Sequence, residues 1–193
     1  MGTESIPPNR SVAGLVAQLG RYAYGATPAA GLTAAQWTAL RYFSRANRFS
    51  RTVSAFAEFH ATTRGTASGT AKSLVQEGYL KRTPSSSDGR STRLDVTSKA
   101  REILSNDPFQ RLVRASAALS TPAEHAVTRS LERVLEELAQ DLGKPRFGVC
   151  TGCRHLCADG CRLQGQPPYE CGLLEEPLAE PEIEQLCVNF ASS

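Results

Sequence analysis

Cysteine is absent from the first 149 residues of this 193-residue chain, and all six cysteines lie between positions 150 and 187. Long apolar runs are also absent: no stretch reaches the about 18 residues that a membrane-spanning helix needs. The sequence has no basic and apolar leader of the secretory type, and we therefore expect a reducing, cytoplasmic setting. In such a setting, clustered cysteines more often bind metal or respond to redox state than form structural disulfides.

Catalytic motifs are missing as well. The sequence contains no glycine-rich nucleotide fingerprint, no Gly-x-Ser-x-Gly turn and no neighbouring Cys, His and Asp of a nucleophilic site. His60 and His155 are isolated, and we interpret both as structural or solvent-exposed. These absences argue against an enzyme and leave a redox enzyme or electron carrier as a minor alternative.

Charge is divided unevenly along the chain. Residues 1–149 contain 20 Lys and Arg against 12 Asp and Glu, whereas residues 150–193 contain 2 against 7. The net charge is therefore +8 for the body and −5 for the tail. A basic body with an acidic tail favours contact between the body and a polyanion such as nucleic acid.

Apolar spacing and capping signals predict a series of helices interrupted by one hairpin. Residues 12–23 have helical spacing, and Thr33-Ala-Ala-Gln36 is a capping box that opens a second helix. Shorter helices are expected at about 53–60 and 63–77, the latter closed by Gly78. Two extended pieces around a Ser-rich turn then predict a hairpin over 79–96.

Two longer helices are expected after the hairpin. The first runs from Thr97 to about 119, with Pro108 as a potential bend. The second begins with Thr121-Pro122-Ala-Glu124, interpreted as a second capping box with proline at the first helical position, and ends near 142. Three helices followed by a hairpin between helices are typical of a winged helix-turn-helix. The expected fold class is thus mainly α with a small β-wing and flanking dimerisation helices.

The most specific pattern lies in residues 79–100. It consists of an Asp-x-Arg-Ser turn, a basic residue and a Leu-x-Val-Thr strand end, supplied by Asp88, Arg90, Ser91, Arg93, Leu94, Val96 and Thr97. With the helix order over roughly residues 10–142, this pattern resembles the MarR family of regulators. The resemblance implies an obligate homodimer that binds a pseudo-palindromic operator in double-stranded DNA. It also leaves room for a small-molecule effector, often phenolic in this family.

The helix expected at 63–77 has an apolar inward stripe and a polar outward face that includes Gly65 and Gly69. Each outward glycine costs a helix about 1 kcal/mol relative to alanine, and close approach to a groove wall would explain both. A helix N-terminus also favours phosphates and base edges. An ordinary solvated face is the alternative. The candidate DNA contacts on this helix are Thr63, Arg64, Thr66, Lys72 and Ser73, with Arg64 and Lys72 foremost.

The hairpin supplies further candidate contacts. In MarR-like proteins the positions of Asp88 and Arg90 brace the wing, and an arginine at the wing tip enters the minor groove. Narrow A·T-rich minor grooves attract arginine electrostatically. We therefore assign the minor-groove contact to Arg90, a phosphate contact to Arg93 and wing bracing to Asp88, with a merely solubilising hairpin as the alternative.

The helix expected at 121–142 carries a near-heptad apolar seam, which suits packing against another helix. In MarR-like proteins the terminal helices form the dimer, so the resemblance assigns this seam to the dimer interface together with residues 12–23. Burial in an intramolecular core is the alternative. The seam residues are Val127, Leu131, Val134, Leu138 and Leu142.

The cysteines are spaced C-x2-C-x3-C-x3-C-x9-C-x15-C. Two intervening residues allow Cys150 and Cys153 to bind one metal or one cluster edge. A single site normally needs four thiolates, and we favour a set that ties both ends of the polar tail to one centre: Cys150, Cys153, Cys171 and Cys187. The rival set replaces the last two with Cys157 and Cys161, which are otherwise spare ligands or redox partners.

An iron–sulfur cluster, 4Fe–4S or 2Fe–2S, is the favoured cofactor, and zinc is the alternative. A cluster would make operator binding respond to redox state, oxygen or iron, whereas zinc on four thiolates would form a closed structural site. Because the centre closely follows the expected dimer helix, its loss is expected to change the spacing of the two recognition helices. Half-sites one DNA turn apart, about 34 Å, require a fixed spacing.

Three segments are expected: a flexible terminus (1–9), a winged-helix and dimerisation domain (10–145) and an irregular cysteine-rich tail (146–193). The leading interpretation is a dimeric transcriptional regulator with an iron–sulfur sensor. The main alternative is a repressor that responds to a small molecule and carries a structural zinc site.

Overall fold

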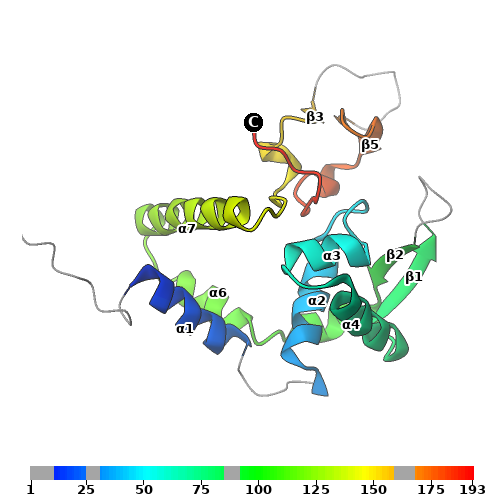
Figure 1. The fold of residues 1–193 in the computed structure, drawn as a ribbon, viewed down its shortest axis with the longest axis horizontal. Coiled ribbons are helices and arrows are strands. Elements are labelled where there is room, and N and C mark those ends of the chain that lie inside the picture. The colour runs from blue at the N-terminus through cyan, green and yellow to red at the C-terminus, as the bar shows by residue number, and fades with distance from the viewer. Residues whose placement is uncertain (1–10, 25–30, 85–91, 159–167) are drawn as a thin grey trace, which may run out of the picture.

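The computed structural model describes residues 11–24, 31–84, 92–158 and 168–193, and the expected flexible terminus lies outside these ranges (Figure 1). The body is mainly helical. Its elements are α1 (Val12–Tyr24), α2 (Ala34–Arg45), α3 (Val53–Phe59), α4 (Arg64–Gln76), β1 (Leu80–Pro84), β2 (Thr92–Val96), α5 (Ser98–Leu104), α6 (Gln110–Ser116) and α7 (Thr121–Asp141). The tail contains η3 (Cys150–Gly152), β3 (Leu156–Cys157), β4 (Tyr169–Cys171), β5 (Glu176–Leu178) and η4 (Glu180–Glu182).

The winged helix-turn-helix is confirmed. Helices α2, α3 and α4 pack around a buried core that includes Leu40, Phe43 and Leu74, each fully shielded from solvent. Strands β1 and β2 form an antiparallel hairpin in which Leu80 pairs with Val96. This small sheet follows α4 directly, as the wing of a winged helix does (Figure 1).

Local capping explains where the core helices begin and end. The Thr33 hydroxyl accepts a hydrogen bond from the Gln36 N–H at 3.2 Å, and the Gln36 side chain accepts one from the Thr33 N–H at 2.8 Å, so the predicted capping box is present. Threonine also caps α3, α4 and α5. Gly78 has a φ of +77°, a conformation that glycine adopts without strain, and it ends α4 as predicted.

The single helix expected from 97 to about 119 is wrong, because the chain breaks into α5 and α6. Asp107, immediately before Pro108, accepts hydrogen bonds from the Arg41 Nε at 2.7 Å and the Arg41 Nη2 at 2.6 Å. Its Oδ1 also accepts from the Phe109 N–H at 2.8 Å. This buried ion pair fixes a turn where proline already removes a helical hydrogen bond.

Helices α1, α6 and α7 lie beside the winged helix rather than within its core (Figure 1). The capping box expected at Thr121 is wrong, because α7 begins at Thr121 itself, with Ser120 as an N-cap that makes no side-chain cap bond. Pro122 does lie in the first helical turn, where proline is tolerated. None of the helices in the described ranges is long and apolar enough to cross a membrane.

The tail has more regular structure than expected. Strands β3, β4 and β5 form a small antiparallel sheet in the order β3-β4-β5. Cys150, Leu178 and Ile183 form the buried centre of this unit. After β4 the tail continues as strand β5 and the single 3₁₀ turn η4.

Candidate DNA-binding surface and cysteine site

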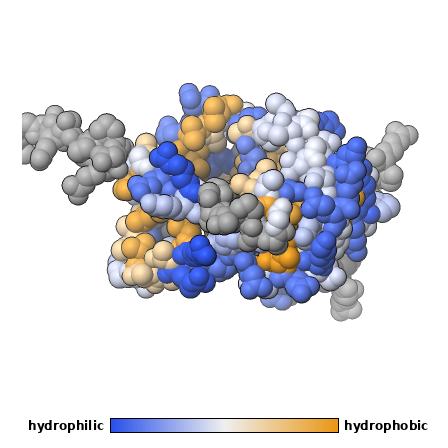
Figure 2. Space-filling model, turned by 90° about the horizontal axis from the view of Figure 1, so that it is seen from below, coloured by the Kyte–Doolittle hydropathy of each residue, from blue (hydrophilic) through white to orange (hydrophobic). Residues whose placement is uncertain are grey.

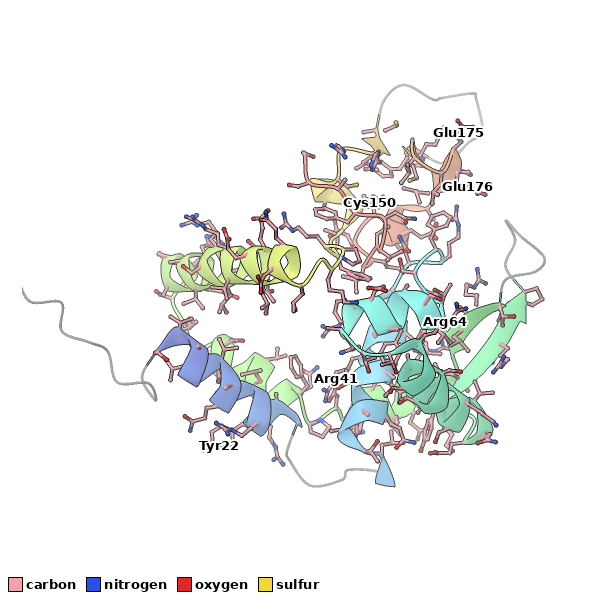
Figure 3. All side chains as sticks on the ribbon, in the orientation of Figure 1. Tyr22, Arg41, Arg64, Cys150, Glu175 and Glu176 are labelled. Carbon is pink, nitrogen blue, oxygen red and sulfur yellow. The ribbon has the colours of Figure 1, made fainter. Side chains whose placement is uncertain are left out.

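Helix α4 presents its first turn to solvent. The Thr63 hydroxyl accepts a hydrogen bond from the Thr66 N–H at 3.1 Å, and Thr63, Arg64 and Thr66 are exposed. Lys72 is exposed two turns further along, whereas Ala67, Ala71 and Leu74 are buried. Figure 3 labels Arg64 at the start of this helix. The exposed N-terminal turn provides N–H donors and a positive charge, which suit a phosphate or base edge.

Ser73 is the exception among the predicted α4 contacts. Its hydroxyl donates to the Glu77 Oε1 at 2.7 Å and accepts from the Gln36 Nε2 at 3.0 Å. The same Gln36 amide also donates to Glu77 at 2.8 Å. Ser73 therefore joins α4 to α2, and its hydroxyl is engaged inside the domain.

The described part of the wing carries basic residues on both strands. Asp88 and Arg90, predicted as the wing brace and the minor-groove residue, lie outside the described residues. Arg93 is only 24% exposed, and its Nε donates to the Asp95 Oδ2 at 3.3 Å, so it forms an ion pair within the domain. Lys81 and Arg82 on β1 are exposed and were not predicted. The sequence could have indicated them, because both basic residues directly follow Leu80 in the strand that leads to the wing turn.

Arg51 is a second residue that the sequence did not single out. Its Nη1 donates to the Asp95 Oδ1 at 2.9 Å and its Nε to the Ala46 carbonyl at 2.8 Å. Burial alone would raise the pKa of Asp95, but hydrogen bonds from Arg51 and Thr83 and the charges of Arg93 and Arg51 lower that pKa below its usual value. Arg51 thereby connects the α2–α3 loop with the wing.

The tail brings the four favoured cysteines into one neighbourhood. Cys150 and Cys187 are each 7% exposed, and Cys153 and Cys171 are half-buried. Burial raises the pKa of Cys150 to about 11, with further contributions from the charges of Cys187, Cys153, Cys171 and Glu182. The sulfurs are neighbours without converging: within the described ranges, no three His, Cys, Asp or Glu side chains stand close enough together to hold a single metal ion.

Of the two spare cysteines, Cys157 lies within the described residues. Cys157 lies on β3, where its sulfur is 3.1 Å from the position that a Cβ on Gly172 would occupy. It is not among the groups that perturb Cys150. Cys161 lies outside the described residues. The charges of Cys187, Cys153 and Cys171 act on the pKa of Cys150, while Cys157 lies on the strand that pairs with β4 beside Gly172, and the choice between the two ligand sets stays a prediction.

Three separate chain segments meet at this pair. The Cys150 N–H donates to the Ile183 carbonyl at 2.8 Å, and the Cys153 N–H donates to the Cys150 carbonyl at 2.9 Å in η3. The Ala191 N–H points at the Cys153 Sγ at 3.5 Å. Figure 3 labels Cys150 in η3, at the base of the tail. Backbone donors near thiolate sulfurs stabilise bound metals and clusters.

The tail is also fastened to the winged helix through the α2–α3 loop. Arg48 donates to the Glu182 carboxylate and the Pro177 carbonyl. The Asn47 N–H of the same loop donates to the Leu186 carbonyl of the tail at 2.9 Å. The expected boundary at 145–146 is therefore spanned by contacts, although the division into domains stays a prediction.

Comparison with known proteins agrees with this geometry. The sequence model of the MarR family matches residues 30–91, which include α2, α3, α4 and β1. No match was found among curated proteins.

Solved structures similar to this chain include transcriptional regulators of the MarR family. A MarR/EmrR family transcriptional regulator from Acinetobacter sp. ADP1 shares 16% identity over 70% of this chain and 99% of its own, with a TM-score of 0.56. MepR of S. aureus in a DNA complex shares 16% over 66% and 96%, with a TM-score of 0.56. CouR of Rhodococcus jostii RHA1 bound to p-coumaroyl-CoA shares 19% over 70% and 96%, with a TM-score of 0.54.

These similarities show that the fold is that of a MarR winged-helix protein. The family model matches only residues 30–91, and the match therefore indicates a local similarity to the MarR family within the winged helix. The neighbours are covered almost completely, while about 30% of this chain has no counterpart in them.

Proposed function

We propose that this protein is a homodimeric, sequence-specific DNA-binding transcriptional regulator whose operator binding depends on a cysteine-ligated centre in its tail. The observation that carries the DNA-binding part is the exposed first turn of α4, with Arg64 and two threonines on a winged-helix scaffold. The solved complex of the similar MepR with DNA supports the same use of this fold. No catalytic role is proposed.

The DNA contacts divide by their exposure. Thr63, Arg64, Thr66 and Lys72 on α4 remain the proposed major-groove and phosphate contacts, because all four are exposed. Lys81 and Arg82 join them as phosphate contacts from the wing. Arg90 and Asp88 keep their predicted roles, while Arg93 acts through its pair with Asp95. Selection of bound sequences from random duplex DNA tests this assignment, and recovery of no pseudo-palindromic motif would contradict it.

A second copy of the chain would cover the apolar surface of the flanking helices. Val127, Val134 and Leu138 of α7 are 46–51% exposed, Leu131 is half-buried, and α7 has no buried residue. Val12, Leu15, Val16 and Leu19 of α1 are 44–59% exposed. Figure 2 shows hydrophobic surface in the half of the molecule that carries these helices. Exposed apolar residues repeated along two flanking helices are typical of an association surface, which favours the dimer over the intramolecular alternative.

The cysteine centre is proposed as an iron–sulfur cluster bound by Cys150, Cys153, Cys171 and Cys187, with Cys157 and Cys161 as spare thiols. The charges of Cys187, Cys153 and Cys171 act on the pKa of the buried Cys150, and a backbone N–H is aimed at Cys153, which supports this donor set. A cluster would supply sensitivity to redox state, oxygen or iron in a reducing, cytoplasmic setting. Zinc on the same thiolates is the alternative. Anaerobic purification with iron, sulfide and zinc analysis separates the two.

A small-molecule effector is a second candidate for control. A cavity of about 410 Å³ lies between the ends of α3 and α7 and the tail, lined mainly by apolar residues such as Phe59, Leu138 and Phe190. The similar CouR was solved with p-coumaroyl-CoA bound. Release of operator DNA by phenolic compounds from protein with an intact metal site would favour this mode of control.

A further inference from the structure

The segment Leu186–Val188 of the tail, called here the strap, is hydrogen-bonded to the end of α2 and to the α2–α3 loop of the winged helix. The Leu186 N–H donates to the Arg45 carbonyl, and the Leu186 carbonyl accepts from the Asn47 N–H, both at 2.9 Å. The Val188 N–H donates to the Ser50 Oγ at 2.8 Å. Asn47 and Ser50 are fully buried, so these bonds are shielded from water.

Cys187 occupies the middle of the strap. Its N–H donates to the Gly148 carbonyl at 2.8 Å, which ties the strap to the Cys150 side of the tail. Burial, and after it the charge of Cys187, raises the pKa of Tyr42, so this thiol lies beside a core tyrosine of α2. The Tyr42 hydroxyl in turn donates to the Ser50 carbonyl at 2.7 Å. One proposed ligand is thus held against the core of the DNA-binding domain.

The same loop continues directly into the wing. The Arg51 carbonyl, one residue after Ser50, accepts a hydrogen bond from the Leu94 N–H of β2 at 2.8 Å. The Arg51 guanidinium pairs with Asp95 on the same strand. The bond from the strap to Ser50 and the bond from β2 to Arg51 therefore meet at adjacent residues of the α2–α3 loop, which connects the strap with β2.

We propose that the strap transmits the state of the cysteine centre to the wing of the same protomer, an inference that rests on the proposed function of that centre. With Cys187 ligated, the strap holds the α2–α3 loop, and Arg51 holds β2 in the position that meets DNA. Loss of the ligated centre frees the strap, loosens the wing and weakens operator binding. This route does not require a change in the spacing of the two recognition helices.

Ser50→Ala tests the route in the full-length protein. The substitution removes the acceptor of the Val188 N–H but leaves the backbone bonds of residue 50 and all cysteines in place. Ser44→Ala is the matched control, because the Ser44 hydroxyl bonds the Arg41 carbonyl at 2.9 Å and does not touch the tail. Metal content, operator affinity with and without metal, and amide hydrogen exchange are measured for wild type and both variants.

We expect Ser50→Ala to retain wild-type metal content and to exchange amides of residues 92–96 about fivefold faster or more, with a smaller effect of metal removal on operator affinity. Ser44→Ala should behave as wild type. Faster exchange in residues 186–188 with no change in 92–96 would overturn the inference. A protein without metal would end the proposal of a metal sensor, while the exchange comparison would still decide whether strap and wing are linked.

Arg48→Gln replaces Ser50→Ala if that variant does not fold. It removes the contacts of Arg48 with Glu182 and Pro177 at the partly exposed edge of the same junction. Arg45→Gln, an exposed position on α2, is its control. Faster exchange at 92–96 in Arg48→Gln alone supports the route, and equal exchange in the two variants contradicts it.

Discussion

Gly148→Ala is expected to disrupt the packing of the first residues of the tail against Phe190 near its end. A Cβ at this position would lie 2.6–2.7 Å from three atoms of the Phe190 ring. Ordinary carbon–carbon contacts are about 3.5–4.0 Å, so the ring has to move by a large fraction of an ångström or more. The ring is rigid, and its neighbour Ala191 is held by the 2.9 Å bond from the Arg154 N–H to the Ala191 carbonyl.

Overpacking of this kind costs about 1–3 kcal/mol. For a chain of this length, that cost lowers Tm by about 2–12 °C. The displacement also moves the Ala191 N–H away from the Cys153 sulfur, so we expect the fraction of chains that hold metal to fall together with Tm.

Gly152→Ala is the matched control for this prediction. Its Cβ would meet the same Phe190 ring at 3.8 Å, an ordinary contact, and it lies in η3, directly before Cys153. Thermal unfolding and metal analysis of both variants provide the comparison. In the Gly148→Ala background, Phe190→Leu should recover part of the lost stability. Equal behaviour of the two alanine variants, or wild-type stability of Gly148→Ala, would refute the steric reasoning.

Four further predictions follow from other parts of the molecule. Arg64→Ala should weaken operator binding by about 1–3 kcal/mol without changing Tm, measured by titration at fixed salt. Asp107→Ala should destabilise the fold by about 3–5 kcal/mol in denaturant unfolding, because it breaks a buried bidentate pair. The pKa of Asp95 is lowered in the folded state, so Asp95 stabilises the fold above its ordinary pKa of 3.8, and this stabilisation is lost as pH falls through the folded-state pKa. Asp95→Asn should therefore make the unfolding free energy decline less steeply in acid. Val134→Glu should convert the dimer to monomer in sedimentation experiments, since it places a charge at the centre of the exposed seam.

The winged helix could be predicted because its signals are local. The Thr33–Gln36 capping box, the glycine at the end of α4 and the alternation in the hairpin each act over a few residues, and the structure follows them. The same reasoning placed Arg64 and Lys72 on an exposed face. Local signals are sufficient where a residue's environment is decided within one or two helical turns.

The errors arise where a distant partner decides the outcome. The break between α5 and α6 depends on Arg41, 66 residues before Asp107. Ser73 faces Gln36, 37 residues earlier, and no pattern within α4 distinguishes its position from that of Lys72. Spacing alone could not reveal either contact.

In the tail, both local spacing and distant contacts matter. The grouping of Cys150 with Cys171 and Cys187 came from the need of a polar segment to have both of its ends at one centre, and it stays a prediction, although the charges of both thiols act on the pKa of Cys150. The hydrogen bond between the strap and Ser50 joins residues 138 positions apart, and no sequence pattern predicted it. The expectation that the centre acts through the spacing of recognition helices stays a prediction, and the strap offers a more direct route.

The most direct test is the affinity of the anaerobically purified, full-length dimer for its selected operator before and after removal of metal, with iron, sulfide and zinc counted per chain. We expect iron with matching sulfide and a loss of operator affinity of about tenfold when the cluster is removed. Equal affinity of the loaded and cluster-free proteins would contradict the claim that the cysteine centre controls DNA binding.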